Sequence, residues 1–194
     1  MISIPHRCIF VKVPKTAGTS IAVVLRAANV GKPHRDLREI RSALASIPAG
    51  PAFYESAFKF GFVRNPWDRV VSMYHRKERG RKDAPADFTD FCEWIEKASD
   101  TCIHPSPKQN QRDWLTDDSD KIAVDFIGRF ESLRDGFATI CENIGAPNLK
   151  LPHENNNARA KRKHYTEYYT PALRDLIGEK FAVDVETFGY KFDA

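Results

Sequence analysis

The order of apolar and polar residues predicts strands and helices in alternation along the chain. Residues 8–13 and residues 58–63 are rich in β-branched and aromatic residues and are followed by turn-forming residues, which is typical of buried strands. A third strand is expected over residues 123–130. Apolar residues recur at helical spacing after each of these runs. Such alternation is typical of a mostly parallel sheet with helices on both faces, so we expect the α/β fold class.

Certain residues mark the points where helices are expected to begin. Asp36 and Asp87 each precede a segment with apolar residues at helical spacing, as an N-cap residue does. Ser132 and Asp135 have the spacing of a capping box at the start of a third helix. Pro171 suits the first turn of the last helix. The apolar face of that last helix is expected to consist of Leu173, Leu176, Ile177, Phe181 and Val185.

Composition and charge indicate a folded protein with an anionic ligand. Hydrophobic residues make up 42% of the 194 residues, which suits one domain with its own core, expected over residues 1–194. The net charge is only +4, yet basic residues cluster in residues 59–82 and in residues 159–163. Clusters of this kind in a nearly balanced chain indicate an anion site. The alternative is that both clusters form solvated surface.

The four cysteines give no sign of a metal site. Their spacing contains neither a Cys-x-x-Cys pair nor a zinc pattern, so we expect no metal. A bridge between Cys92 and Cys102 is left open. The sequence shows no signal peptide, and its apolar runs are too short to span a membrane. We therefore expect a cytoplasmic protein without stable membrane insertion.

Residues 14–20, Pro-Lys-Thr-Ala-Gly-Thr-Ser, connect the first predicted strand to the first predicted helix. Backbone N–H groups at a helix start bind anions, and Gly18 permits a close approach of the backbone to a ligand. Thr19 and Ser20 add hydroxyl donors, and Lys15 adds a full positive charge. A Walker A loop has a different order, because here Lys15 precedes the glycine. The alternative is an ordinary strand–turn–helix with capping hydroxyls.

Residues 60–74 contain a second pattern that suits a phosphate group. Arg64 follows the second predicted strand, and Ser72 lies about two helical turns further along the chain. An arginine holds a phosphate through a charged fork, and a serine hydroxyl adds a neutral donor. Arg69 is expected to form a structural ion pair, and Trp67 is expected to lie in the core.

The two patterns, in this order, resemble the nucleotide-binding motifs of the sulfotransferase family, in its carbohydrate-type branch known as sulfotransferase family 2. Further sequence motifs that resemble this family lie in residues 127–131, residues 164–169 and residues 188–190, so the resemblance covers most of the chain. It is weakest over residues 76–120. The resemblance implies a P-loop-NTPase-like sheet and the donor 3′-phosphoadenosine 5′-phosphosulfate (PAPS), with no metal.

The resemblance also implies which residues bind the donor. Those implied at the 5′-phosphosulfate group are Lys15, Thr16, Gly18, Thr19 and Ser20. Arg64 and Ser72 are implied at the 3′-phosphate. Arg162 and Tyr165 belong to a basic segment that is implied to close over the nucleotide. The alternative for this segment is a solvated loop.

Transfer of a sulfonate group to a hydroxyl group needs a cation and a base. Lys15 is expected to stabilise the negative charge on the leaving phosphate. His34 is the candidate base, because histidine titrates near neutrality and lies between the two motifs. Related carbohydrate sulfotransferases take a His or Glu from this segment, so Glu39 and Glu55 compete with it. The alternative for His34 is a surface loop residue.

The acceptor is expected to be a hydroxyl group, with a carbohydrate as the leading class. The residues that could face it are Gln109, Asn110, Gln111 and Trp114. Two other functions compete: a P-loop-like nucleotide kinase, which would need a Gly-Lys-Ser/Thr ending, and a non-catalytic adenosine-phosphate-binding module. No nucleic acid partner is expected, because the sequence contains no recognisable nucleic-acid-binding module. The oligomeric state is not predicted.

Overall fold

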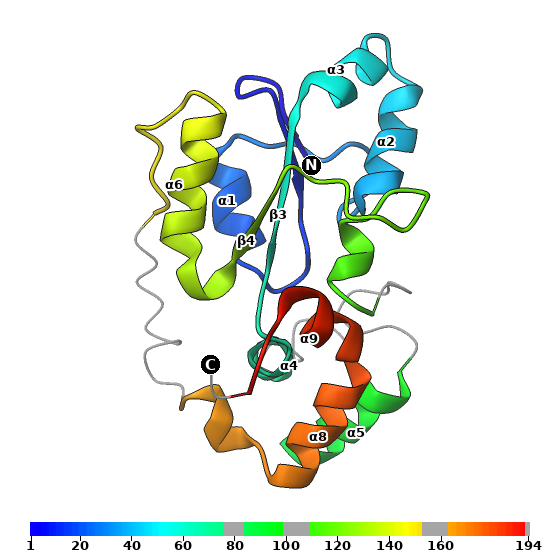
Figure 1. The fold of residues 1–194 in the computed structure, drawn as a ribbon, viewed down its shortest axis with the longest axis vertical. Helices are drawn as coiled ribbons and strands as arrows, with labels where there is room; N and C mark the ends of the chain where they lie inside the picture. The colour runs from blue at the N-terminus through cyan, green and yellow to red at the C-terminus, as the bar shows by residue number, and fades with distance from the viewer. Residues whose placement is uncertain (76–83, 99–108, 153–162, 193–194) are drawn as a thin grey trace. The chain divides into compact units, whose positions relative to one another are not determined.

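A computed structural model describes residues 1–75, 84–98, 109–152 and 163–192 (Figure 1). The chain divides into two compact units. The first, called the sheet unit below, consists of Met1–Val63 and Arg112–His153. The second, called the helical unit, consists of Arg64–Gln111 and Glu154–Ala194. The expectation of one domain over the whole chain stays a prediction.

The sheet unit contains a four-stranded, mostly parallel sheet, which confirms the α/β class. The strands lie in the order β1-β2-β3-β4. β1 is antiparallel to β2, while β2, β3 and β4 are parallel to one another. Three bounds differ from the prediction, because β2 ends at Val11 rather than at residue 13 and β4 covers residues 126–129 rather than 123–130. β1 was not predicted. The strands are β1 Ile2–Ser3, β2 Cys8–Val11, β3 Phe58–Val63 and β4 Phe126–Arg129.

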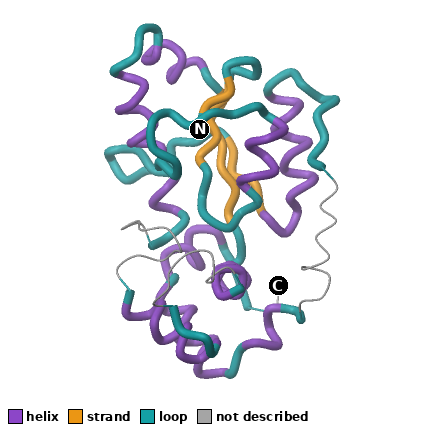
Figure 2. Tube along the Cα trace, turned by 180° about the vertical axis from the view of Figure 1, so that it is seen from behind, coloured by secondary structure: helices purple, strands orange, loops and turns teal. Residues whose placement is uncertain are grey.

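Helices cover both faces of this sheet, as Figures 1 and 2 show from opposite sides. One face is covered by α1 Gly18–Val24 and α6 Leu133–Asn143. Their apolar side chains form a core with those of the strands, made of Cys8, Phe10, Phe60, Phe62, Ile21, Leu25, Phe137, Ile140 and Cys141. The other side holds α2 Leu37–Ala45 and α3 Gly50–Ser56, of which α3 was not predicted. β2 is consequently buried along its whole length, whereas β4, at the edge of the sheet, is only partly buried.

Two of the three predicted helix caps are confirmed. Asp36 accepts the backbone N–H of Glu39, whose carboxylate accepts the backbone N–H of Asp36 in return. Asp87 caps the helical unit's α5 Phe88–Lys97. The capping box at Ser132 is wrong: its side chain makes no cap hydrogen bond, because the 3-10 turn Phe130–Ser132 leads directly into α6. Its backbone is consequently not in the extended conformation of an N-cap residue.

The helical unit consists of short helices around an aromatic core. The Trp67 indole N–H donates to the carbonyl of Arg174 at 2.8 Å, and the ring packs edge-on against Phe192, which confirms its predicted core position. The prediction of a single last helix from Pro171 is wrong, because the helix is interrupted at Phe181, where φ is −112° and ψ is 29°. The helices are α4 Pro66–Tyr74, α5 Phe88–Lys97, α8 Pro171–Lys180 and α9 Ala182–Phe188, with the 3-10 helix η4 Tyr165–Tyr168.

Throughout the described part of the chain, every helix is too short or too polar to cross a membrane.

Candidate functional site

The loop between β2 and α1 contains most of the predicted phosphosulfate-binding residues. Thr16 is fully buried, and its hydroxyl donates to the carbonyl of Val13 at 2.9 Å. The backbone of Lys15 and of Ala17 is left-handed, with φ of 73° and 62°. A left-handed residue other than glycine costs about 1 kcal/mol or more, and such strain gathers at functional sites. The Thr16 side chain therefore helps to hold the loop in shape.

Gly18 is required for a reason that differs from the expected one. A Cβ atom at this position would lie 2.5 Å from Lys12 Cγ and 2.9 Å from Lys12 Cε. The Lys12 side chain thus passes directly over the first residue of α1, where only glycine leaves room for it. The sequence pattern missed Lys12, because a lysine in a strand-like run gives no sign of lying on a loop six residues later. Lys15 and Ser20 are half-buried, and Thr19 is exposed.

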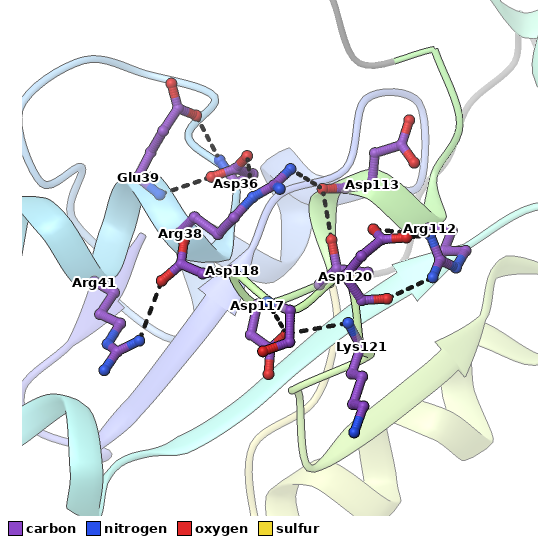
Figure 3. A network of polar contacts seen from close by, with 12 residues as sticks. Asp36, Arg38, Glu39, Arg41, Arg112, Asp113, Asp117, Asp118, Asp120 and Lys121 are labelled. Carbon is purple, nitrogen blue, oxygen red and sulfur yellow. Dashed lines mark hydrogen bonds and ion pairs between the residues drawn. The ribbon is translucent and has the colours of Figure 1, made fainter.

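His34 lies just before α2, in left-handed backbone with φ of 56°, and is half-buried. The helix start that follows is held by the Asp36–Glu39 capping box. Arg38 Nε lies 3.6 Å from the Asp36 carboxylate, and its guanidinium reaches the carbonyl of Asp113 (Figure 3). The Glu39 carboxylate accepts the backbone N–H of Asp36 and thereby stabilises the start of the helix. Glu55 is exposed on α3.

Two further ion pairs involve the segment that follows the helical turn Arg112–Trp114, and one of them joins this segment to α2 (Figure 3). Arg41 pairs with Asp118 at 3.3 Å, and Arg112 pairs with Asp120 at 2.9 Å. The carboxylate of Asp117 accepts two backbone N–H groups of its own turn, which lowers its pKa. Exposed pairs of this kind contribute little to stability.

Arg64, which is predicted to bind the 3′-phosphate, lies in the helical unit, and its side chain pairs with a carboxylate. Arg64 Nε donates to Asp68 Oδ2 at 2.8 Å, and Arg64 Nη2 lies 2.7 Å from Asp68 Oδ1. The arginine side chain is 6% exposed. A guanidinium has five N–H donors, so an arginine binds a carboxylate on one edge and a phosphate on another. Asn65 caps the helix α4 that presents Asp68.

The structure places Tyr165 against Asn65, the residue that follows Arg64. Its ring is buried, and the Asn65 amide donates to its hydroxyl at 3.4 Å, one residue from Arg64. Ser72 lies on α4 and is 5% exposed; among the described residues, none accepts a hydrogen bond from its hydroxyl. Arg162 lies outside the described residues. Arg64, Ser72 and Tyr165 therefore share the helical unit, while the residues from Lys15 to His34 belong to the sheet unit.

The predicted structural ion pair of Arg69 is confirmed. Arg69 Nη1 lies 3.7 Å from Asp184 Oδ2, and both side chains are almost completely buried. The expectation that Gln111 and Trp114 face an acceptor is wrong, because their side chains are 0% and 1% exposed. Gln111 instead bonds to the backbone of Arg64, a contact between residues 47 positions apart that no local pattern reveals.

Cys92 is a free, buried thiol, and burial raises its pKa to about 12. Its candidate partner Cys102 lies outside the described residues. Within the described residues, no group of His, Cys, Asp and Glu side chains is arranged to hold a metal ion.

Comparison with known proteins identifies the family. The model of the sulfotransferase family matches residues 1–191. The chain belongs to the sulfotransferase family. The family expected from the two motifs is thereby confirmed, and membership supports a transferase.

This family member is similar to carbohydrate sulfotransferase 14 of Danio rerio, with 25% identity over 98% of the chain. The chain spans 61% of that relative's length. It is also 32% identical, over 50% of the chain, to an uncharacterized protein of Archaeoglobus fulgidus, of which the match covers 76%. No solved structure matches the chain.

Proposed function

We propose that this family member transfers a sulfonate group from PAPS to a hydroxyl group of a carbohydrate. One observation carries the proposal: both anion-binding motifs directly follow neighbouring parallel strands, β2 and β3. Ligands of parallel α/β sheets bind at the carboxyl ends of the strands. The carbohydrate sulfotransferase of Danio rerio supports the acceptor class, because it aligns with nearly the whole chain.

In this proposal, the loop of the sheet unit binds the 5′-phosphosulfate group. Lys15 supplies the cation, while Gly18, Thr19 and Ser20 supply backbone and hydroxyl donors. Thr16 contributes its backbone, since its hydroxyl is bonded to Val13. Arg64 and Ser72 bind the 3′-phosphate, and Arg162 and Tyr165 contact the nucleotide beside it.

The reaction in this proposal is an in-line displacement at sulfur. The acceptor oxygen forms a bond to sulfur as the bond from sulfur to the 5′-phosphate oxygen breaks. His34 takes the proton of the acceptor hydroxyl. Lys15 stabilises the charge that appears on the leaving 3′-phosphoadenosine 5′-phosphate. No redox partner and no metal enters this balance.

Calorimetry with 3′-phosphoadenosine 5′-phosphate tests the donor. We expect it to bind more tightly than ATP, and equal binding of the two nucleotides would remove the donor assignment. Incubation with labelled PAPS and a panel of carbohydrates, lipids and small alcohols tests the acceptor. Label should pass to carbohydrates, and transfer to another class alone would overturn that part.

The base is tested by His34→Ala. Turnover should fall by at least about a hundredfold, the usual contribution of a positioned base, while nucleotide binding is unchanged. Glu55→Gln, a change at an exposed carboxylate on α3, is the matched control and should keep full turnover. Loss of turnover in the control alone would transfer the role of base to Glu55. The cytoplasmic location expected from the sequence is a separate proposal, for which fractionation of cells is the test.

A further inference from the structure

The backbone of Arg64 is held by a side chain rather than by a strand. The amide oxygen of Gln111 accepts the N–H of Arg64 at 2.9 Å, and the amide nitrogen of Gln111 donates to the carbonyl of Arg64 at 2.8 Å. These are the two bonds that a neighbouring strand would make with one residue. β3 ends at Val63, so Gln111 satisfies the main chain at the first residue beyond the strand.

Gln111 is in turn held by a buried acid. Its backbone N–H donates to Asp184 Oδ2 at 2.8 Å, and Asp184 is fully buried on α9. The same carboxylate oxygen faces Arg69, whose guanidinium donates to the carbonyl of Gln109 and lies 5.7 Å above the ring of Phe181. Because the helix is interrupted at Phe181, a new helix, α9, begins there, and its residue Asp184 reaches this cluster.

Stability alone does not account for such an arrangement. Removing two charges from water costs about as much as their attraction returns, so apolar residues of similar size would stabilise the unit at least as well. The side chains of Asp184 and Gln111 instead each hold the backbone of a neighbour, Asp184 that of Gln111 and Gln111 that of Arg64. The series from Arg69 through Asp184 and Gln111 ends at the main chain of Arg64.

The guanidinium of Arg64 is fixed at its other end by Asp68, through two bonds of 2.8 and 2.7 Å. An arginine whose backbone and head group are both held has lost its rotamer freedom before a ligand arrives. Ordering such a side chain at binding otherwise weakens affinity, so an arginine ordered beforehand binds more tightly and more selectively.

We propose that Gln111 and Asp184 are positioning residues that hold Arg64 ready for the 3′-phosphate of the nucleotide. The proposal rests on the proposed donor. It assigns to these two buried residues the selection of nucleotides that have a 3′-phosphate over those that lack one.

Calorimetry on the whole chain tests this proposal through two dissociation constants, for 3′-phosphoadenosine 5′-phosphate and for adenosine 5′-phosphate. Their ratio measures the contribution of the 3′-phosphate and is independent of the folded fraction. We expect a ratio above about tenfold in the wild type, the size of one charged hydrogen bond. Gln111→Met keeps the side-chain length but removes both bonds, and the ratio should fall to within about threefold of unity, with adenosine 5′-phosphate affinity retained.

Two further variants keep the test decisive. Gln111→Glu retains an oxygen for the Arg64 N–H, and Asp184→Asn retains an acceptor for the Gln111 N–H, so a folded protein is available even if Gln111→Met unfolds. Both should lower the ratio. Ile177→Val, a fully buried change on α8, is the control for general loosening and should keep the wild-type ratio. Folded Gln111 and Asp184 variants with the wild-type ratio would overturn the positioning role. A wild-type ratio near one would instead refute the donor itself.

Discussion

The loop that contains Lys15 and the segment that contains Arg64 differ in how deeply their residues are buried. Lys15 is half-buried, in a loop with left-handed backbone at two residues other than glycine. Arg64 is 5% exposed and is bonded through its side chain to Asp68 and through its backbone to Gln111.

This difference matches two separate tasks in sulfonate transfer. A cation that stabilises charge appearing during the reaction must follow atoms as their bonds break, which suits a long side chain on a loop. A residue that recognises a permanent phosphate gains from being immobile before the ligand binds. We therefore expect substitutions in the loop to change the rate and substitutions around Arg64 to change affinity.

Lys15→Ala should show the largest effect. Without the cation, the leaving phosphate is not stabilised, and kcat should fall by about 10² to 10³, as for the loss of one transition-state donor. The dissociation constant of 3′-phosphoadenosine 5′-phosphate should change much less. Single-turnover kinetics with PAPS separates the two quantities. If the variant loses only affinity, Lys15 acts in binding as Arg64 does, and the proposed difference between the two residues is refuted.

Arg64→Ala should show the opposite division. The dissociation constant of 3′-phosphoadenosine 5′-phosphate should rise by about 10- to 100-fold, because a charged hydrogen bond to phosphate is lost. Binding of adenosine 5′-phosphate should stay as it is. Arg64→Lys keeps the charge but cannot make the two-bond contact with Asp68, so it should recover only part of the affinity. Full recovery by lysine, measured by calorimetry, would contradict a role for the fixed geometry.

Gly18→Ala should have a smaller effect, which arises because the new methyl group displaces the Lys12 side chain. The added Cβ must displace the Lys12 side chain from its Cγ atom outward. We expect the Michaelis constant for PAPS to rise by about tenfold, since overpacking at a well-filled position typically costs 1–3 kcal/mol. The double variant Lys12→Ala with Gly18→Ala should be no worse than Lys12→Ala alone. Additive effects in this cycle would separate the two residues.

Alkaline pH should change the free energy of unfolding of both units rather than ligand affinity or rate. Burial raises the pKa of Cys8 in the sheet unit to about 11 and that of Cys92 in the helical unit to about 12, from 9.0. Below pH 9 both thiols are protonated whether folded or unfolded, so their contribution to stability is complete. Above pH 9 the unfolded chain loses the protons first, and each thiol lowers the free energy of unfolding by about 1.4 kcal/mol per pH unit.

Urea denaturation at pH 8, 9 and 10 measures this slope. Cys92→Ala should reduce the slope, whereas a slope that is the same in both proteins would show that the buried thiol does not contribute.

Much of the fold follows from local pattern. β3 has the predicted bounds of residues 58–63, because a run of aromatic and β-branched residues ends there at a charged residue. Asp36 and Asp87 begin their helices, because a cap depends only on the N–H groups of the next turn. The short strand Ile2–Ser3 and the helix Gly50–Ser56 were missed, since elements of two and seven residues hardly show a period.

The candidate site likewise contains residues that a local motif predicts and residues that no local motif reveals. The family and the candidate residues Lys15, Gly18 and Arg64 follow from sequence alone, because the motif residues lie close together in the chain. The folded structure was needed to show that Lys12 passes over Gly18, that a helix ends at Phe181, and that Gln111 holds Arg64. The hydrogen bond from Gln111 to Asp184 joins residues 73 positions apart. Such a pair leaves no period or spacing in the sequence, because its geometry exists only after the elements have packed.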